Sequence, residues 1–345
     1  MIIGRDLITS LGLVIKGSDQ SIKWDDAAIP WRDMESTQAD AYFADNRRSN
    51  QPIEQEIQRM TDILDAKYSK ADLRKIVEEA THLNDEEKEQ LYKTFKKNED
   101  LFDGTLGTFT GEPYDIKLKE NAEPFHTRPF PVPRIHEFTF RSELDRLCSL
   151  GVLKRVNRSQ WGAPTFIIPK KDGTVRFISD FRELNKRIKR QPYPIPKIQD
   201  LLLRLEGFRY GTSLDLNMGY YHIALSDKSK ELCTITTQWG KYEYQRLPMG
   251  LCNSADIFQE KMSKLLSGLD TVRVYIDDIL HVSKGTFEEH LKVLDDVFAR
   301  LRQSGLKVNA TTSNFGQHEL DYLGYHITHT GIMPIAKKVQ GIINI

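Results

Sequence analysis

The stretch that decides the fold is Val272-Arg273-Val274-Tyr275-Ile276-Asp277-Asp278-Ile279-Leu280. Two adjacent carboxylates, Asp277 and Asp278, stand where an otherwise apolar strand would continue. Burying two ionised acids side by side is strongly unfavourable unless a positive charge lies between them. Mg²⁺ is the natural candidate, because it prefers a few carboxylate oxygens together with phosphate oxygens. The alternative is a strand–turn–strand hairpin whose tip happens to be acidic, since Asp is a common turn residue.

A third carboxylate, Asp215, ends another predicted strand, Thr212-Ser213-Leu214-Asp215-Leu216. If that strand lies beside the acidic hairpin, Asp215, Asp277 and Asp278 converge. Three carboxylates can hold two Mg²⁺ ions about 3.5–4 Å apart, an arrangement that clamps both oxygens of an in-line phosphoryl displacement. One ion would lower the pKa of the attacking hydroxyl, and the other would neutralise charge on a triphosphate.

The charges of the chain are unevenly distributed, although the formal net charge is zero. Residues 1–125 carry 17 Lys and Arg against 26 Asp and Glu, whereas residues 126–345 carry 32 against 23. The stretch 154–209 alone has 14 basic and 5 acidic residues. Such a basic region is typical of a surface that binds a polyanion, and the alternative is a solvated charged face.

Length and composition narrow the class of protein further. The 345 residues allow one large domain or two ordinary ones, and the hydrophobic content of 39% predicts an extended or loosely packed portion. No apolar run approaches the roughly 18 residues of a membrane-spanning helix, and no signal peptide is present. The three cysteines have neither metal-ligand spacing nor a disulfide pattern, which suits a reducing compartment.

Helices and strands mix without a regular βαβ alternation, which predicts the α+β class. Helical spacing or capping signals predict helices at 53–80, 84–100, 134–150, 256–266 and 287–304. Extended apolar runs predict strands at 166–168, 175–178 and 210–216, the last continuing at 221–225. Prolines predict extended straps at 124–133 and 191–196.

Eight sequence blocks carry a family resemblance, and they occur in the family's order. They are Trp161-Gly162-Ala163-Pro164, Lys170-Lys171-Asp172-Gly173-Thr174-Val175-Arg176, Asp180-Phe181-Arg182-Glu183-Leu184-Asn185-Lys186, Ser213-Leu214-Asp215-Leu216 through Tyr221, Leu247-Pro248-Met249-Gly250-Leu251-Cys252-Asn253, Ile257-Phe258-Gln259, Tyr275-Ile276-Asp277-Asp278 and Tyr322-Leu323-Gly324-Tyr325. From about Pro113 to Ile345 the sequence resembles the reverse transcriptase region of a gypsy-type (Metaviridae) long-terminal-repeat retrotransposon Pol polyprotein. Ala255 departs from the pattern, since relatives commonly have Pro there, and we expect this change to be tolerated.

The resemblance implies a right-hand polymerase with fingers, palm and the start of a thumb. Asp215, Asp277 and Asp278 match the family's catalytic aspartates, and Leu216 would lend a backbone carbonyl to one metal ion. The implied cofactor is a pair of Mg²⁺ ions, for which Mn²⁺ can substitute.

Other matching residues would bind the nucleotide and the primer. The nucleotide-binding positions are Lys170, Lys171, Arg176, Tyr220 and Met249. Arg176 and one of the two lysines would hold the triphosphate, because fixed cations offset negative charge that develops there. Tyr220 matches an aromatic gate beneath the sugar, and Met249 a residue that packs on the base and sugar. The turn Leu323-Gly324-Tyr325 would position the primer end. The alternatives are solvated charges for the basic residues and core packing for Tyr220 and Met249.

The resemblance also suggests how the chain is divided. Residues 1–16 are expected to be a remnant of the C-terminus of a retroviral-type aspartic protease, because Ile2-Ile3-Gly4-Arg5-Asp6-Leu7-Ile8 is similar to its closing segment. No Asp-Thr/Ser-Gly triplet occurs in the chain, so we expect no peptide hydrolysis. Residues 17–110 would be a linker and helical connector. The polymerase would take 111–345, with fingers at about 111–190 and 223–253, palm at about 191–222 and 254–333, and the start of the thumb at 334–345.

The leading hypothesis is an RNA-directed DNA polymerase that transfers nucleotides to a primer 3′-hydroxyl. Its partners would be RNA and DNA template-primers and deoxynucleoside triphosphates, with no membrane partner, and the sequence predicts no particular oligomeric state. Its place would be intracellular, in cytoplasmic virus-like particles and the nucleus. The alternative is a catalytically silent, truncated retroelement remnant that only binds nucleic acid. The intact carboxylates favour the enzyme, whereas the truncated thumb and the lack of ribonuclease H, integrase and zinc-knuckle regions favour the remnant.

Overall fold

The computed structural model describes residues 14–16, 21–24, 27–30, 69–169, 175–203, 205, 207–216 and 218–335. The chain forms two compact units, residues 1–57 and 58–345. In the first unit, β1 (Val14–Lys16), β2 (Ser21–Trp24) and β3 (Ala27–Pro30) form an antiparallel sheet. Two of these strands lie in the stretch that the sequence indicated as linker. The protease-like motif at residues 2–8 lies outside the described residues and stays a prediction.

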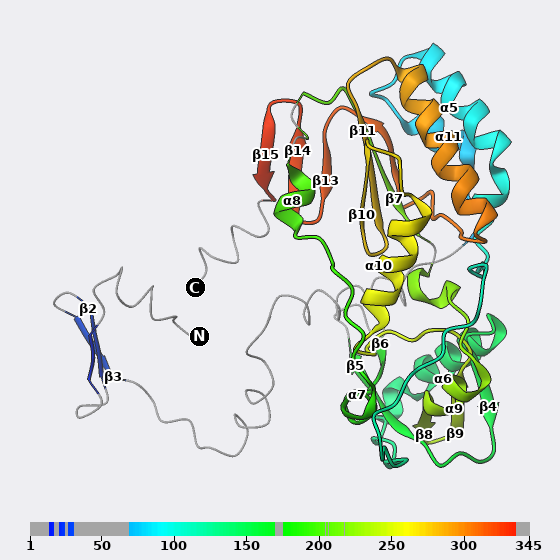
Figure 1. The fold of residues 1–345 in the computed structure, drawn as a ribbon, viewed down its shortest axis with the longest axis vertical. Coiled ribbons are helices and arrows are strands. Elements are labelled where there is room, and N and C mark those ends of the chain that lie inside the picture. The colour runs from blue at the N-terminus through cyan, green and yellow to red at the C-terminus, as the bar shows by residue number, and fades with distance from the viewer. Residues whose placement is uncertain are drawn as a thin grey trace. The chain divides into compact units, whose positions relative to one another are not determined.

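Four antiparallel strands form the central sheet of the larger unit, in the order β10-β11-β7-β12. They are β7 (Tyr210–Asp215), β10 (Val272–Tyr275), β11 (Asp278–Ser283) and β12 (Asn314–Gln317). Figure 1 shows α5 (Asp85–Lys97) and α11 (Phe287–Gln303) side by side along one face of this sheet. The buried positions of α11 recur every three or four residues, so the helix presents one apolar stripe to the core.

A five-stranded sheet, in the order β4-β9-β8-β5-β6, lies at the other end of the larger unit (Figure 1). Its strands are β4 (Leu153–Val156), β5 (Ala163–Pro169), β6 (Val175–Ser179), β8 (Thr234–Thr237) and β9 (Gly240–Tyr244). Neighbouring strands are antiparallel except β5 and β8. The helices of this region are α6 (Arg134–Ser149), α7 (Arg182–Arg187) and α9 (Asp227–Leu232).

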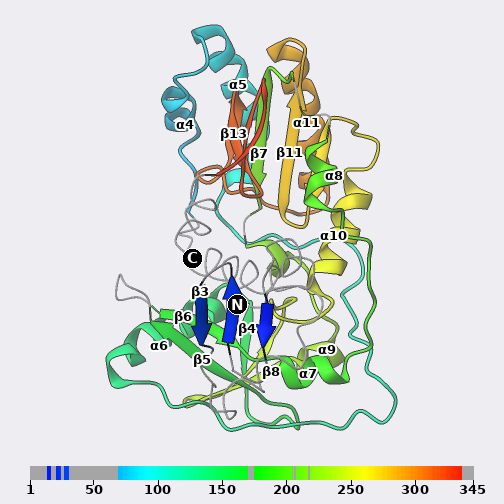
Figure 2. The same ribbon diagram turned by 90° about the vertical axis from the view of Figure 1, so that its left-hand side faces the viewer.

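A small three-stranded sheet packs beside the central sheet. It contains β13 (Leu320–Tyr322), β14 (Tyr325–Thr328) and β15 (Gly331–Pro334). Figure 2 shows β13, β7 and β11 side by side. A separate apolar cluster joins the small sheet to α8 (Ile198–Leu202) and to β11 through Leu202, Phe208, Leu280, Leu320 and Ile327.

The helical connector packs into the main core. It consists of α4 (Leu73–Glu79), α5 and the 3₁₀ helix η1 (Glu99–Phe102). The ring of Phe102 lies edge-on to Phe298 of α11, with centroids 5.4 Å apart, and Phe95 lies edge-on to Phe315 of β12 at 4.7 Å. Two predicted capping boxes are present, Asn84 with Glu87 on α5 and Thr286 with Glu289 on α11.

The proline strap at 191–196 joins the two large sheets and is anchored at the start of α10 (Ser254–Leu265). Asn253 Oδ1 accepts a hydrogen bond from the backbone N–H of Gln191 (3.2 Å), and Asp256 Oδ1 accepts one from Tyr193 (2.8 Å). Asp256 is buried, and its charge is offset by Arg190, whose Nη1 lies 2.8 Å from Oδ2.

The predicted helix at 53–80 was wrong in its extent, because residues 69–72 are not helical and α4 begins at Leu73. The predicted continuation of strand β7 was also wrong. Residues 221–225 do not continue strand β7, because residues Gly219–His222 form the 3₁₀ helix η2. Met218 has φ +62° and Gly219 has φ +40°, and these left-handed conformations turn the chain out of the strand direction. Within the described part of the chain, no helix has both the length and the apolar character needed to cross a bilayer.

Candidate active site

Two of the three candidate aspartates, Asp215 and Asp278, lie on adjacent strands of the central sheet. In the antiparallel pair β7–β11, Asp215 is the register partner of Asp278. Asp277 precedes Asp278 in the turn that joins β10 to β11, where Tyr275 pairs with Asp278. The sheet register therefore brings Asp215, Asp277 and Asp278 to one end of two adjacent strands, although Asp215 lies far from the other two in sequence.

The turn before Asp278 has an unusual backbone. Ile276 has φ +56° and is buried, and a β-branched residue rarely adopts this left-handed conformation. The side chain of Gln259, on α10, forms two hydrogen bonds with the backbone around this turn. Its Oε1 accepts a hydrogen bond from the N–H of Ile276 (2.7 Å), and its Nε2 donates to the carbonyl of Val274 (3.3 Å). The buried amide of Gln259 thus satisfies two backbone groups next to Asp277.

Asp215 is held from the opposite side by the segment 309–313. Its N–H donates to Ser313 Oγ (3.0 Å), and its carbonyl accepts from the N–H of Asn309 (2.9 Å). The hydroxyl of Thr312 donates to carboxylate atom Oδ2 of Asp215 (2.5 Å). The next residue, Leu216, pairs with Val308 in an isolated bridge. These contacts orient both the backbone and the carboxylate of Asp215.

The candidate ligand atoms are of the chemical type that Mg²⁺ prefers. Carboxylate oxygens and a backbone carbonyl are the hard ligands that this ion takes, and Asp215, Leu216, Asp277 and Asp278 provide them. Within the described residues, however, no three His, Cys, Asp or Glu side chains form a group that could hold a metal ion. The sheet register and the adjoining turn thus bring the backbones of Asp215, Asp277 and Asp278 to the same end of two adjacent strands.

The candidate gate residue Tyr220 lies in η2 and is 5% exposed. Its ring meets Phe258 of α10 edge-on, with centroids 5.3 Å apart. Met249 is also buried, in the loop between β9 and α10. Asn185 of α7 fixes this loop, because its Nδ2 donates to the carbonyl of Gly250 (2.8 Å) and its Oδ1 accepts from the N–H of Cys252 (2.9 Å).

The structure says little about the candidate triphosphate ligands. Lys170 and Lys171 lie outside the described residues. Of Arg176 only the backbone is described, on β6 opposite Ile168 of β5. These three assignments therefore remain predictions.

The candidate primer turn is a two-residue hairpin loop between β13 and β14. Tyr322 pairs with Tyr325, and the two residues between them, Leu323 and Gly324, have φ +50° and +79°. Positive φ at both positions is the mark of a type I′ turn, which suits the twist of the flanking strands. The phenol of buried Tyr322 donates a hydrogen bond to the backbone carbonyl of Asp278 (3.3 Å), which connects this turn to β11.

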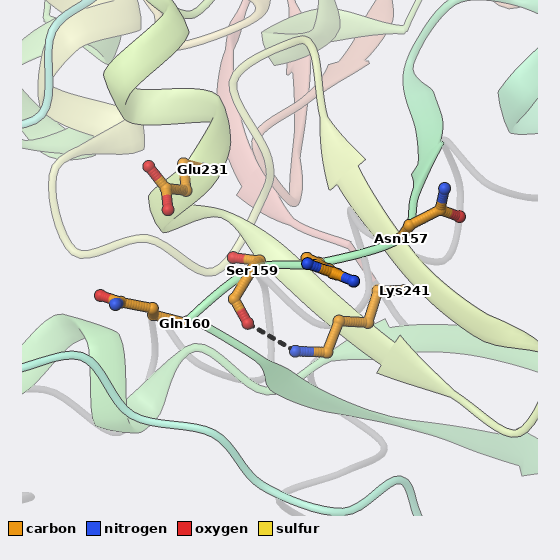
Figure 3. Close-up of a pocket in the computed structure, with 6 residues that line it drawn as sticks. Asn157, Ser159, Gln160, Glu231 and Lys241 are labelled. Atoms are coloured by element: carbon orange, nitrogen blue, oxygen red, sulfur yellow. Dashed lines mark hydrogen bonds between the residues drawn. The ribbon is translucent and has the colours of Figure 1, made fainter.

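A separate open pocket lies on the five-stranded sheet. Figure 3 shows its lining residues, which are Asn157, Arg158, Ser159, Gln160, Glu231 and Lys241. Lys241 Nζ donates to the backbone carbonyl of Ser159 (2.7 Å). None of the candidate catalytic, gate or primer residues lines this pocket.

Sequence reasoning missed four residues that support the site: Gln259, Thr312, Asn185 and Tyr322. Three of them stand inside the quoted motif blocks, but no role was assigned to them. The signal for Gln259 is a buried amide on the apolar face of a helix, which implies a buried backbone partner. Thr312 carries no comparable signal, because the exposed loop around it is polar.

Comparison with known proteins adds a decisive observation to this geometry. Residues 168–327 match the family described as "Reverse transcriptase (RNA-dependent DNA polymerase)". The chain contains a reverse transcriptase domain.

Relatives of this reverse transcriptase domain include a transposon polyprotein and an uncharacterized protein. The Drosophila melanogaster retrovirus-related Pol polyprotein from transposon 297 is 30% identical over 272 residues, which cover 76% of this chain and 26% of that one. The Caenorhabditis elegans uncharacterized protein K02A2.6 is 35% identical over 246 residues, 70% of this chain and 19% of that one. The predicted resemblance to a gypsy-type retrotransposon Pol polyprotein is confirmed. The chain thus spans only about a fifth to a quarter of the length of these two relatives.

Solved structures confirm the right-hand polymerase fold of the reverse transcriptase domain. A foamy viral protease-reverse transcriptase in complex with double-stranded DNA has a TM-score of 0.72 at 27% identity, covering 81% of this chain and 50% of that one. The same kind of protein in complex with an RNA/DNA hybrid has a TM-score of 0.72 at 28% identity, covering 79% and 37%.

Proposed function

We propose that this chain provides the fingers and palm of an RNA-directed DNA polymerase, which adds deoxynucleotides to a primer 3′-hydroxyl. The observation that carries the proposal is the register pairing of Asp215 with Asp278, with Asp277 in the adjoining turn. Its template-primers would be RNA and DNA, in line with the titles of the similar structures, which name double-stranded DNA and an RNA/DNA hybrid.

The proposed boundaries agree with the sheets. All strands of the five-stranded sheet fall within the expected finger ranges, 111–190 and 223–253, and all strands of the central sheet fall within the expected palm ranges, 191–222 and 254–333. The basic surplus at 154–209 lies mostly in the fingers, where cations attract nucleic acid phosphates.

Asp215, Asp277, Asp278 and the carbonyl of Leu216 would hold two Mg²⁺ ions, with Mn²⁺ as a substitute. When bound, these ions supply positive charge at the primer hydroxyl and at the triphosphate. The protein's own residues then position the reactants. Arg176 with Lys170 or Lys171 would bind the triphosphate, Tyr220 would bar a 2′-hydroxyl, and Met249 would pack on the base. Residues 323–325 would place the primer end.

Primer extension on RNA and on DNA templates tests the proposal. Asp277→Asn should abolish nucleotide addition and leave the affinity for template-primer nearly unchanged, because that affinity comes mainly from phosphate contacts by basic residues. Asp270→Asn is the matched control, since Asp270 is exposed and precedes β10. Nucleotide addition by Asp277→Asn at the parent rate would overturn the assignment. A parent protein that binds template-primer but adds no nucleotide with Mg²⁺ or Mn²⁺ would favour the silent remnant.

A further inference from the structure

His222 occupies a fully buried position at the end of η2, two residues after the candidate gate Tyr220. Both nitrogens of its ring have backbone partners. The N–H of Lys307 donates to Nε2 (3.1 Å), so Nε2 carries no proton, and Nδ1–H donates to the carbonyl of Gly219 (2.9 Å). Burial lowers the pKa of His222 to about 4, so the ring is neutral at pH 7. The neighbouring bonds therefore select one tautomer and one ring orientation.

The segment that receives His222 also holds the catalytic strand. Lys307 bonds the His222 ring, Val308 pairs with Leu216, and the N–H of Asn309 donates to the carbonyl of Asp215. The consecutive residues Lys307, Val308 and Asn309 thus contact His222 of η2, Leu216 and Asp215, respectively. Because the same segment holds both, a displacement of His222 relative to Lys307 also displaces η2 relative to Asp215.

The surroundings of the His222 ring leave it little freedom. A Cβ atom added to Gly107 would lie 2.0 Å from the carbonyl oxygen of Gly305 and 3.1 Å from Cδ2 of His222. Gly305 has φ +77°, and a Cβ there would lie 2.0 Å from the carbonyl oxygen of Thr108. On the other side, the N–H of Phe109 donates to the carbonyl of His222 (2.8 Å). The segments around Gly107 and Gly305 therefore lie tightly against each other beside His222.

We propose that His222 is a positioning residue that sets the Tyr220 ring against Asp215 and thereby tunes discrimination between deoxyribonucleoside and ribonucleoside triphosphates. The inference rests on the proposed polymerase function. A gate that works by steric exclusion depends on where the ring stands relative to the sugar, and the sugar is placed by the catalytic centre. His222 connects the gate helix η2 to the segment that holds Asp215, through its hydrogen bonds with Gly219 and Lys307.

The test compares two conservative variants. The side-chain amide of His222→Asn can still donate to Gly219 but is too short to reach Lys307, whereas the longer His222→Gln can still accept from Lys307. We expect His222→Asn to lower the ratio of kcat/KM for a deoxynucleotide to that for the matching ribonucleotide by about tenfold, as the loss of one buried hydrogen bond implies. His222→Gln should retain most of this ratio. Tyr220→Ala gives the ratio that is expected when the gate ring is absent.

His281→Asn is the matched control, because His281 is a buried histidine whose ring nitrogens lie within hydrogen-bonding distance of the carbonyls of Thr271 and His290. It should lower stability without changing the ratio. An unchanged ratio in His222→Asn, alongside a lowered ratio in Tyr220→Ala, would overturn the inference and leave the polymerase proposal intact. A parent protein without DNA synthesis would instead overturn the polymerase proposal.

A measurement on the parent protein covers the case in which the variants do not fold. Nitrogen-15 spectra of histidine-labelled protein at pH 7 should show His222 neutral and protonated at Nδ1. A ring protonated at Nε2, or a charged ring, would show that the bond from Lys307 is not formed and would overturn the inference.

Discussion

At the scale of single residues, the turn between β10 and β11 in the candidate active site combines backbone strain with hydrogen bonds from a single side chain. Ile276 adopts a left-handed conformation that costs of the order of 1–3 kcal/mol, and such a residue persists only where its surroundings over-determine it. Gln259 provides that constraint through bonds on both sides of Tyr275. The position of Asp277 therefore depends on an amide from a different element.

Replacing Gln259 by Leu should disturb this turn. The buried N–H of Ile276 and the carbonyl of Val274 would each lose a partner, at a cost of about 1–3 kcal/mol in unfolding free energy. Nucleotide addition should fall more than template-primer binding does. Denaturant unfolding and single-turnover primer extension measure the two effects. Gln303→Leu, on the exposed face of α11, is the control. If Gln259→Leu matches the parent in both assays, the support role is wrong.

At the scale of elements, the small sheet is connected to β11 by apolar packing and by one hydrogen bond. Leu320 and Ile327 share an apolar cluster with Leu280 of β11, and the Tyr322 phenol donates to the carbonyl of Asp278. The position of the turn that would hold the primer end is therefore fixed relative to Asp278, a candidate catalytic residue, as well as within its own hairpin.

Tyr322→Phe should test this connection, because it keeps the ring in the cluster and removes only the hydroxyl. We expect kcat for nucleotide addition to fall by up to about tenfold, in keeping with one hydrogen bond, while KM for the deoxynucleotide stays near the parent value. Steady-state kinetics at saturating template-primer provide the measurement. Tyr242→Phe, an equally buried tyrosine on β9, should leave kcat unchanged. A rise in nucleotide KM without a loss of kcat would contradict the proposed link.

Local signals in the sequence predicted much of the element order, and non-local contacts explain what it missed. The capping boxes at Asn84 and Thr286 and the acidic break in an apolar strand are each visible within a few residues. The hydrogen-bond partners of Asp215 and His222 cannot be recognised locally. Thr312 lies 97 residues from Asp215, and Lys307 lies 85 residues from His222. Their roles depend on which segments pair in the fold, and no local pattern of the sequence shows that pairing.

At the scale of the whole molecule, neutral histidines buried in the core link stability to pH. Burial lowers the pKa of His222 to about 4, and burial together with the stacked His281 ring lowers that of His290 to about 2. Burial also lowers the pKa of His281. In the unfolded chain each ring titrates near pH 6.5. The unfolded state thus binds more protons below pH 6.5, and stability falls as the pH drops from there toward the folded values.

We therefore expect acid-induced loss of stability well above the range in which carboxylates titrate. Between pH 7.5 and pH 5, His222 and His290 should each reduce the unfolding free energy by about 2 kcal/mol. Denaturant titrations at several pH values measure this. Carboxylates with lowered pKa values, such as Asp180, contribute only at lower pH. Equal unfolding free energies at pH 7.5 and pH 5 would show that these rings are not buried in neutral form.

When part of this chain is joined to another protein, the position of the junction decides whether the joined part folds. A junction just after residue 102 would take Phe95 and Phe102 away from Phe315 and Phe298, and the rings left behind would face water. The segment that folds as a unit is therefore longer than the region around the candidate active site, because it includes the helices from Leu73 to Phe102. A fusion joined upstream of these helices should therefore be more soluble than one joined just after residue 102.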